Sequence, residues 1–118
     1  NGDVVSPQVS KEMQSLMANI IEKNYRLYGF AQLDNKYLIG GKTGTAQFQK
    51  PGGGYYDDRF NGTFMGFVGG DEPEYVIVVR VDDPRVAGYA GTKAAAPIFV
   101  NLTNMLINNF NVSPRGVQ

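Results

Sequence analysis

The run YVIVVRV, from Tyr75 to Val81, constrains the fold more than any other part of the chain. It is almost continuously apolar and rich in β-branched side chains, which is typical of a strand buried on both faces in the middle of a sheet. Residues 36–49 and 60–69 also have strand-like composition. Only a loop at residues 50–58 and a turn at residues 70–74 separate the three runs, so the pattern predicts an antiparallel sheet of three strands.

Two amphipathic segments flank these strands. Ser6-Pro7 is typical of a helix start, with a serine cap and a proline in the first turn, and apolar spacing predicts a helix over residues 7–23. Its apolar stripe, expected to lie in the core, consists of Val9, Met13, Leu16, Met17, Ile20 and Ile21. A second stripe predicts a closing helix over residues 96–109, with Pro97 in its first turn. The order of elements predicts an α+β fold, with the antiparallel sheet packed against an N-terminal and a C-terminal helix.

The last strand of the three has only one sequential neighbour to pair with. An apolar strand with an open edge favours pairing with another segment. We therefore expect a segment outside this sequence, or a second copy of the chain, to lie along Tyr75 to Val81.

Composition excludes several classes of function. Eleven basic and eleven acidic side chains cancel, which gives no electrostatic reason to expect nucleic acid as a partner. The chain has no cysteine and no histidine, so thiolate chemistry, a Ser-His-Asp triad within the chain and ordinary zinc sites are excluded. No apolar run approaches the roughly 18 residues needed to span a bilayer. The acidic pairs at residues 57–58 and 82–83 are interpreted as loop carboxylates, and no metal site is predicted.

The stretch GGKTGTAQF, residues 40–48, allows three interpretations. A phosphate-binding P-loop is excluded because Lys36 stands where its first glycine is required, and because TAQFQ is extended in character. In a strand, Thr43 and Thr45 share a face and can bind a carboxylate, while Lys42 lies opposite unless a twist or bulge turns it. Gly44 leaves room for a substrate backbone. The remaining alternative is a plain edge strand whose lysine prevents aggregation.

The segments GGKTGTAQ, FMGFVGGDEPEYVIVVRVDDP and GYAGTKAAAPIF follow one another in this order. Together they resemble the C-terminal part of the transpeptidase domain of class B penicillin-binding proteins, in which K-T-G is a known motif. The resemblance extends over nearly the whole chain. It implies a D,D-transpeptidase that cross-links peptidoglycan stem peptides through a serine acyl-enzyme, is acylated by β-lactams and needs no cofactor. It also implies a location at the outer face of the bacterial cytoplasmic membrane or in the periplasm.

The resemblance assigns a role to each residue of the motif. Lys42 supplies positive charge and helps to hold the hydroxyl of an S-x-N motif. Thr43 and Thr45 bind the carboxylate of the stem peptide or β-lactam, and the backbone N–H of Thr45 is an oxyanion donor. Gly44 keeps the strand open to the substrate. Tyr55 and Tyr56, in the predicted loop, are interpreted as solvent-facing aromatics, with substrate contact as the alternative.

None of the four serines begins an S-x-x-K or S-x-N sequence. The nucleophile and its base are therefore missing from this chain, which we expect to be inactive alone. We expect residues 1–118 to be the incomplete C-terminal portion of a single transpeptidase domain. In the family, a strand from before the first helix pairs with the strand matching residues 75–81. The alternative is a non-catalytic binding or interaction module that keeps the fold without the nucleophile.

Overall fold

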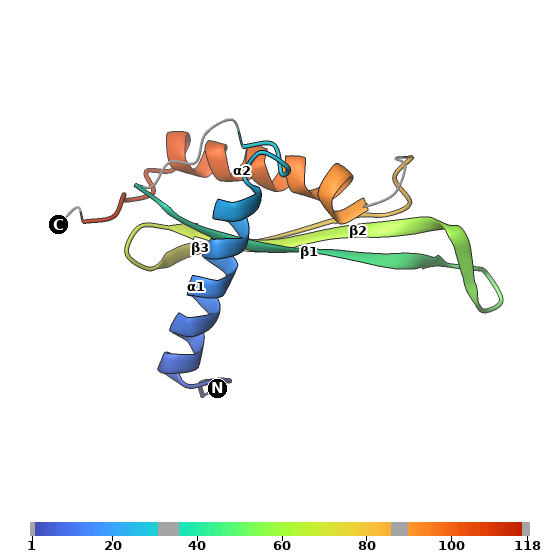
Figure 1. Cartoon of the computed structure of the whole chain (residues 1–118), viewed down its shortest axis with the longest axis horizontal. Coiled ribbons are helices and arrows are strands. Elements are labelled where there is room, and N and C mark those ends of the chain that lie inside the picture. Colours follow the sequence, from blue (N-terminus) through green and yellow to red (C-terminus); the bar gives the residue numbers. More distant parts are fainter. Residues whose placement is uncertain (1, 31–35, 86–89, 117–118) are drawn as a thin grey trace.

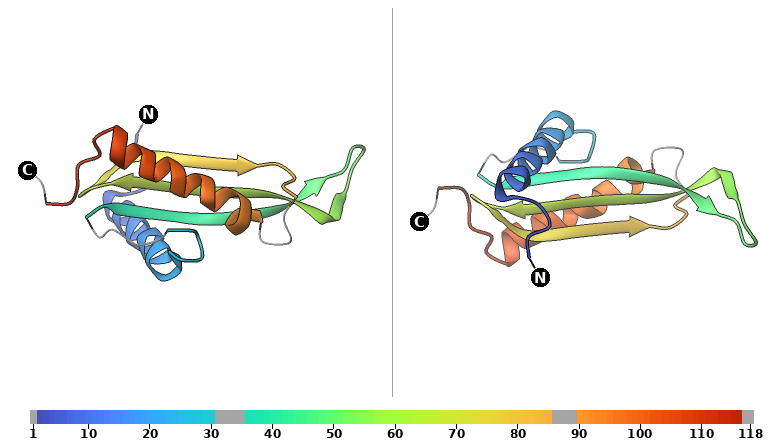
Figure 2. Two further views of the ribbon diagram at one scale, coloured as in Figure 1. Left: turned by 90° about the horizontal axis from the view of Figure 1, so that it is seen from above. Right: turned by 90° about the horizontal axis from the view of Figure 1, so that it is seen from below.

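The computed structural model describes residues 2–30, 36–85 and 90–116. Its elements are α1 (Pro7–Asn24), β1 (Leu38–Gln49), β2 (Tyr55–Gly69), β3 (Pro73–Val81), a short π-helix η1 (Gly91–Ala95) and α2 (Ala96–Asn109). The strands form one antiparallel sheet in the order β1-β2-β3. Figures 1 and 2 show α2 lying along one face of the sheet, whereas α1 projects from the other side. The predicted α+β class, with three antiparallel strands and two helices, is confirmed.

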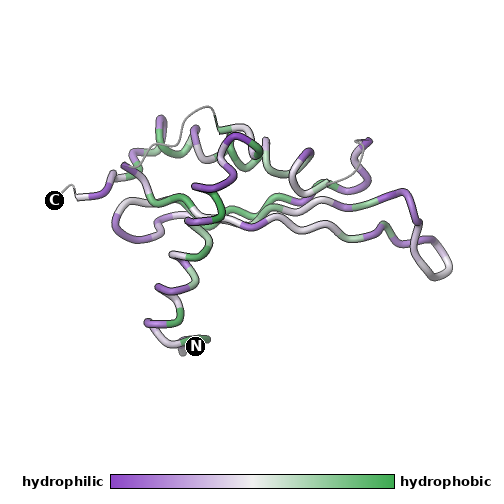
Figure 3. Tube along the Cα trace, in the orientation of Figure 1, coloured by the Kyte–Doolittle hydropathy of each residue, from purple (hydrophilic) through white to green (hydrophobic). Residues whose placement is uncertain are grey.

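The core lies between the sheet and α2. Phe99 of α2 and Phe64 of β2 are both fully buried, and their ring centroids are 4.4 Å apart. Tyr28, which follows α1, packs edge-on against Phe64 at 5.4 Å. Figure 3 shows the apolar stretches of the strands beneath α2, with more polar residues toward the far end of the β1–β2 hairpin. The bounds predicted for the closing helix and the place of Pro97 in its first turn are confirmed.

Helix α1 begins as predicted, but its apolar stripe is mostly outside the core. The Val9 N–H donates a hydrogen bond to the Ser6 Oγ at 3.2 Å, which caps the helix. Ile21 is the buried residue of this helix, whereas Val9, Met13 and Leu16 remain 46–58% exposed. The prediction of a buried stripe is wrong because the N-terminal half of α1 projects from the sheet and no described residue covers it (Figure 1).

Strand β3 has one buried face and one exposed face. Ile77 and Val79 are 9% and 7% exposed, whereas Val76 and Val78 are 75% and 63% exposed. The prediction of burial on both faces is therefore wrong, because α2 covers only one side of the strand. Among the described residues β3 pairs with β2 alone, so the open edge expected from the strand order is confirmed.

The β1–β2 hairpin is longer than the sequence pattern indicated. Residues 50–58 were expected to form a loop, but β2 begins at Tyr55, which pairs with Gln49 of β1. The connecting turn contains three glycines with φ between 76° and 117°, a left-handed region that favours glycine. Likewise, β3 begins at Pro73, inside the expected turn at residues 70–74. No helix in the described ranges is both long and apolar enough to cross a membrane.

Candidate active-site wall on strand β1

The Lys-Thr-Gly-Thr segment lies in β1, at an edge of the described sheet. Lys42 pairs with Met65, Thr43 with Phe64, Gly44 with Thr63 and Thr45 with Gly62, all across β2. The segment is therefore extended, as predicted. Within the described part of the chain, the opposite edge of β1 has no neighbouring strand, and the backbone groups that alternate along that edge can receive an extended ligand.

The structure brings the two threonines together and separates them from the lysine. Thr43 and Thr45 lie on the face covered by α2, since the cross-strand partner of Thr43 is the buried Phe64. Lys42 lies on the opposite face, beside the half-exposed Met65. Its Nζ donates a hydrogen bond to the Thr43 carbonyl at 2.8 Å. No twist of the strand carries the ammonium group to the threonine face.

Gly44 is the residue of the motif with open space around it. A Cβ added to Gly44 would lie no closer than 3.7 Å to another atom, the Cβ of Thr63. A Cβ on Gly41 would instead lie 2.3 Å from the Phe64 ring. Gly41 is therefore required by the packing of the chain itself, whereas the packing of this chain does not require Gly44.

Thr45 makes a contact that the sequence did not reveal. The Gly91 N–H, at the start of η1, donates a hydrogen bond to the Thr45 Oγ1 at 3.2 Å, across a separation of 46 residues. Gly91 belongs to the segment GYAGTKAAAPIF, which carried the family resemblance, but no local pattern assigned it a partner. Gly91 lies before the predicted start of the closing helix at residue 96, in a stretch where no helix was expected.

An ion pair holds the exit of β3 against the hairpin. The Arg59 Nε donates to the Asp83 Oδ1 at 2.9 Å, and the Nη2 contacts the second oxygen of the same carboxylate. This hydrogen bonding lowers the pKa of Asp83 below its usual value and raises the pKa of Arg59. Asp83 has a φ of 48°, and its N–H donates to the Asn61 Oδ1 at 3.0 Å. The carboxylate of Asp82 accepts a hydrogen bond from Arg80. Both carboxylates of this pair are thus engaged with arginines.

Aromatic side chains continue this arrangement along the hairpin. The Arg59 guanidinium lies 4.6 Å from the ring centroid of Phe48 and 4.4 Å from that of Tyr56. Tyr56 is half-buried in β2, and Tyr55 is 59% exposed. Both tyrosines therefore belong to a strand, which corrects their expected place in a loop, and Tyr56 packs against its neighbours.

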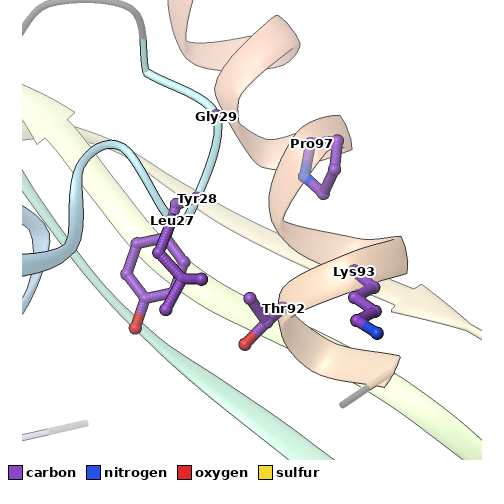
Figure 4. A pocket seen from close by; sticks show the side chains of 6 residues that line it. All are labelled: Leu27, Tyr28, Gly29, Thr92, Lys93 and Pro97. Atoms are coloured by element: carbon purple, nitrogen blue, oxygen red, sulfur yellow. The ribbon is translucent and has the colours of Figure 1, made fainter. Parts of the chain in front are cut away.

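An apolar cavity of about 400 Å³ lies between the segment after α1 and the start of the C-terminal helical region (Figure 4). Its lining residues are Leu27, Tyr28, Gly29, Thr92, Lys93 and Pro97. None of them belongs to β1, although Thr92 follows Gly91, the residue that hydrogen-bonds to Thr45. Of the serines, Ser6 caps α1 and Ser10 accepts a hydrogen bond from the Gln14 side chain at 3.1 Å.

An edge strand carrying Lys-Thr-Gly, in an antiparallel sheet with a long helix on one face, is typical of the serine acyltransferases that react with β-lactams. A family model described as "Penicillin binding protein transpeptidase domain" matches residues 1–104. The chain belongs to this family.

Curated relatives agree with this assignment. The chain is 32% identical over 111 residues to the probable peptidoglycan D,D-transpeptidase PenA of Neisseria flavescens, covering 94% of this chain and 27% of the relative. It is 32% identical over 115 residues to the stage V sporulation protein D of Bacillus subtilis, covering 98% of this chain and 17% of the relative. The chain therefore spans about a sixth to a quarter of the length of these two relatives.

Solved structures show the same fold. Penicillin-binding protein 3 of Mycobacterium tuberculosis, complexed with ampicillin, matches with a TM-score of 0.73 and 30% identity over 97% of this chain and 26% of that one. The transpeptidase domain of Burkholderia pseudomallei penicillin-binding protein 3 matches with a TM-score of 0.76 at 24% identity, covering the whole of this chain and 34% of that domain structure. The second likeness concerns the fold alone.

Proposed function

We propose that Lys42 to Thr45 form one wall of the acylation cleft of a peptidoglycan D,D-transpeptidase. The observation that carries this proposal is the edge strand β1, whose two threonines share a face in a chain of the penicillin-binding protein family. In the proposed reaction, a serine attacks the carbonyl of a stem peptide or a β-lactam and forms an acyl-enzyme. Because the chain has no S-x-x-K sequence, that serine belongs to polypeptide outside residues 1–118.

Each residue of the strand then has a distinct task. The hydroxyls of Thr43 and Thr45 bind the ligand carboxylate, and the backbone N–H of Thr45 donates to the developing oxyanion. Removing one such oxyanion donor costs on the order of a hundred- to a thousandfold in rate in other acyl-transfer enzymes. Gly44 contributes the absence of a side chain, which lets the ligand backbone approach the strand.

Lys42 has its task on the other face of the sheet. Its ammonium group lies on the side from which α1 projects, so it can hold an S-x-N hydroxyl only if the rest of the domain covers that side. The exposed apolar residues there support such a cover, since Met65, Val76 and Val78 all lie on this face. We assign the open edge of β3 to the same partner, the N-terminal part of the domain, with a second copy of the chain as the alternative occupant.

The substrate also determines the place of action. Peptidoglycan is assembled outside the cytoplasm, and the proposed reaction therefore takes place at the outer face of the bacterial cytoplasmic membrane or in the periplasm.

Labelling with a fluorescent penicillin tests this function. The chain alone should form no covalent adduct, whereas the domain completed with its N-terminal portion should form one. In the completed domain, Lys42→Ala should slow acylation by about ten- to a hundredfold, because a hydrogen bond to a charged group is lost. Lys23→Ala, at an exposed lysine of α1, is the matched control and should react normally.

Two results would count against the proposal. A stoichiometric adduct on the chain alone would show that the nucleophile lies within it, and an unchanged rate for Lys42→Ala would remove this residue from the site. Sequencing the gene upstream of the Asn1 codon distinguishes the non-catalytic alternative. S-x-x-K and S-x-N sequences there support the transpeptidase, and an open reading frame that starts at this segment supports an interaction module.

A further inference from the structure

The hydrogen bond from Gly91 determines what the Thr45 hydroxyl can still do. A threonine hydroxyl has one proton to donate and two lone pairs that accept. The Gly91 N–H occupies one of these lone pairs at 3.2 Å. This N–H lies in the first turn of a helix, where backbone donors have no partner within the helix. The hydroxyl proton of Thr45 therefore points away from Gly91 and stays available to an acceptor in front of the strand.

Two glycines permit this contact because they allow the backbones to approach closely. A Cβ on Gly91 would lie 2.5 Å from the Gly44 carbonyl oxygen and 3.1 Å from that of Thr63. A Cβ on Gly62, the cross-strand partner of Thr45, would lie 2.3 Å from the Ala90 carbonyl oxygen. The segment Ala90–Gly91 therefore lies directly on β1 and β2, at the position of the Lys-Thr-Gly motif.

The helical residues that follow Gly91 also restrain its N–H group. The N–H of Ala96 donates to the Gly91 carbonyl, which closes the π-helical turn. Such turns are rare and occur frequently at functional sites. Ala95, Ala96 and Phe99 follow in the same continuous helical stretch and are all fully buried. Gly91 therefore cannot shift relative to Thr45 without disturbing the core.

From these contacts we propose that Gly91 is a positioning residue, which orients the Thr45 hydroxyl so that its proton is directed to the carboxylate of the ligand. This inference rests on the proposed function, because it requires that Thr45 bind that carboxylate. Gly62 supports the arrangement by admitting the Ala90 carbonyl. Gly91 itself touches no reacting atom.

The test compares two ligands in the completed domain: a penicillin with its free carboxylate, and the methyl ester of the same penicillin. The wild-type domain should react faster with the free acid. Gly91→Ala should reduce this preference by about ten- to a hundredfold, since an oriented hydrogen bond to a charged group is lost. Acylation by the ester should also slow, but by less, because the added Cβ would press on the Gly44 carbonyl, whose peptide carries the Thr45 N–H. Thr45→Val, which removes the hydroxyl, should reduce the preference to a similar extent.

Gly70→Ala is the matched structural control. Its Cβ would lie 2.1 Å from the Ser113 carbonyl oxygen, so the clash is comparable, but it occurs at the end of the sheet away from the motif. This variant should keep the wild-type preference for the acid even if its stability falls. A second perturbation avoids any clash: replacing Gly91 by glycolic acid exchanges its N–H for an ester oxygen and adds no atom. It should reduce the preference as Gly91→Ala does.

The outcomes separate this inference from the proposed function. If the wild-type domain prefers the acid and the glycolic acid variant keeps that preference, Gly91 has only a structural role and the inference is wrong. If the wild-type domain reacts with neither ligand, the proposed function itself fails, and this inference fails with it.

Discussion

Gly44 is a position at which a methyl group can be added to the motif without a clash with the rest of the chain. The nearest atom to the added Cβ would be the Thr63 Cβ at 3.7 Å, an ordinary van der Waals contact. Gly44 is also not among the glycines with positive φ, so alanine can adopt its backbone conformation. Gly44→Ala should therefore keep the free energy of unfolding or raise it by about 0.4–1 kcal/mol, because alanine restricts the unfolded chain.

The same methyl group should nevertheless impair acylation. It would project on the same face as Lys42, beside the open edge of β1 along which the ligand backbone is proposed to lie. A displacement of about 1 Å in a reacting complex can cost on the order of a hundredfold in rate, and we expect a loss of this size. Urea unfolding measures stability, and the rate of labelling by a fluorescent penicillin measures acylation in the completed domain.

Gly41→Ala provides the contrast for this experiment. Its Cβ would lie 2.3 Å from the Phe64 ring, and overpacking of this kind costs about 1–3 kcal/mol of stability. The reasoning about Gly44 is refuted if Gly44→Ala reacts at the wild-type rate, because then the ligand does not approach there. It is equally refuted if Gly44→Ala loses as much stability as Gly41→Ala.

Three further predictions concern the rest of the molecule. Because Arg59 lowers the folded-state pKa of Asp83, their ion pair stabilises the fold above the ordinary aspartate pKa of about 4 and loses this effect as the pH falls through the lower folded value. Asp83→Asn should therefore lower the urea midpoint at pH 7 and flatten its decline in acid. If the urea midpoint of Asp83→Asn declines in acid as steeply as that of the wild-type chain, this assignment is contradicted. The Thr103 hydroxyl is fully buried without a hydrogen-bond partner among the described residues, so Thr103→Val should raise the free energy of unfolding by roughly 1–3 kcal/mol, and a loss of stability would reveal a hidden partner. Finally, replacing both Val76 and Val78 by lysine should reduce self-association of the isolated chain in analytical ultracentrifugation, because they form part of its exposed apolar face. A chain that is monomeric before the substitution would exclude the second copy as occupant.

Features that depend on local signals could be predicted from the sequence. The bounds of α2 follow from its apolar spacing and from Pro97, and the start of α1 follows from the Ser6 cap. The extended state of Lys42 to Thr45 likewise follows from local composition. Each of these signals lies within a few residues of the element that it specifies.

Features that depend on distant partners could not be predicted. The apolar stripe of α1, which includes Val9 and Met13, has the composition of a core, and so does the outer face of β3. Burial requires a covering element, however, and no described residue supplies one. The contact between Gly91 and Thr45 joins residues far apart in sequence, and it depends on how closely two backbones approach. No periodicity encodes such an approach.

The helical stretch that begins at Gly91 connects β1, the strand proposed to face the ligand, with the interior of the protein. Phe99 lies about two turns further along it, roughly 12 Å from Gly91, and packs against Phe64. Close-packed interiors transmit displacements instead of absorbing them. A substitution that slides this helix along its axis therefore alters the surroundings of Thr45. If the proposed function holds, such a substitution changes the reaction with a β-lactam from a position that the β-lactam never contacts.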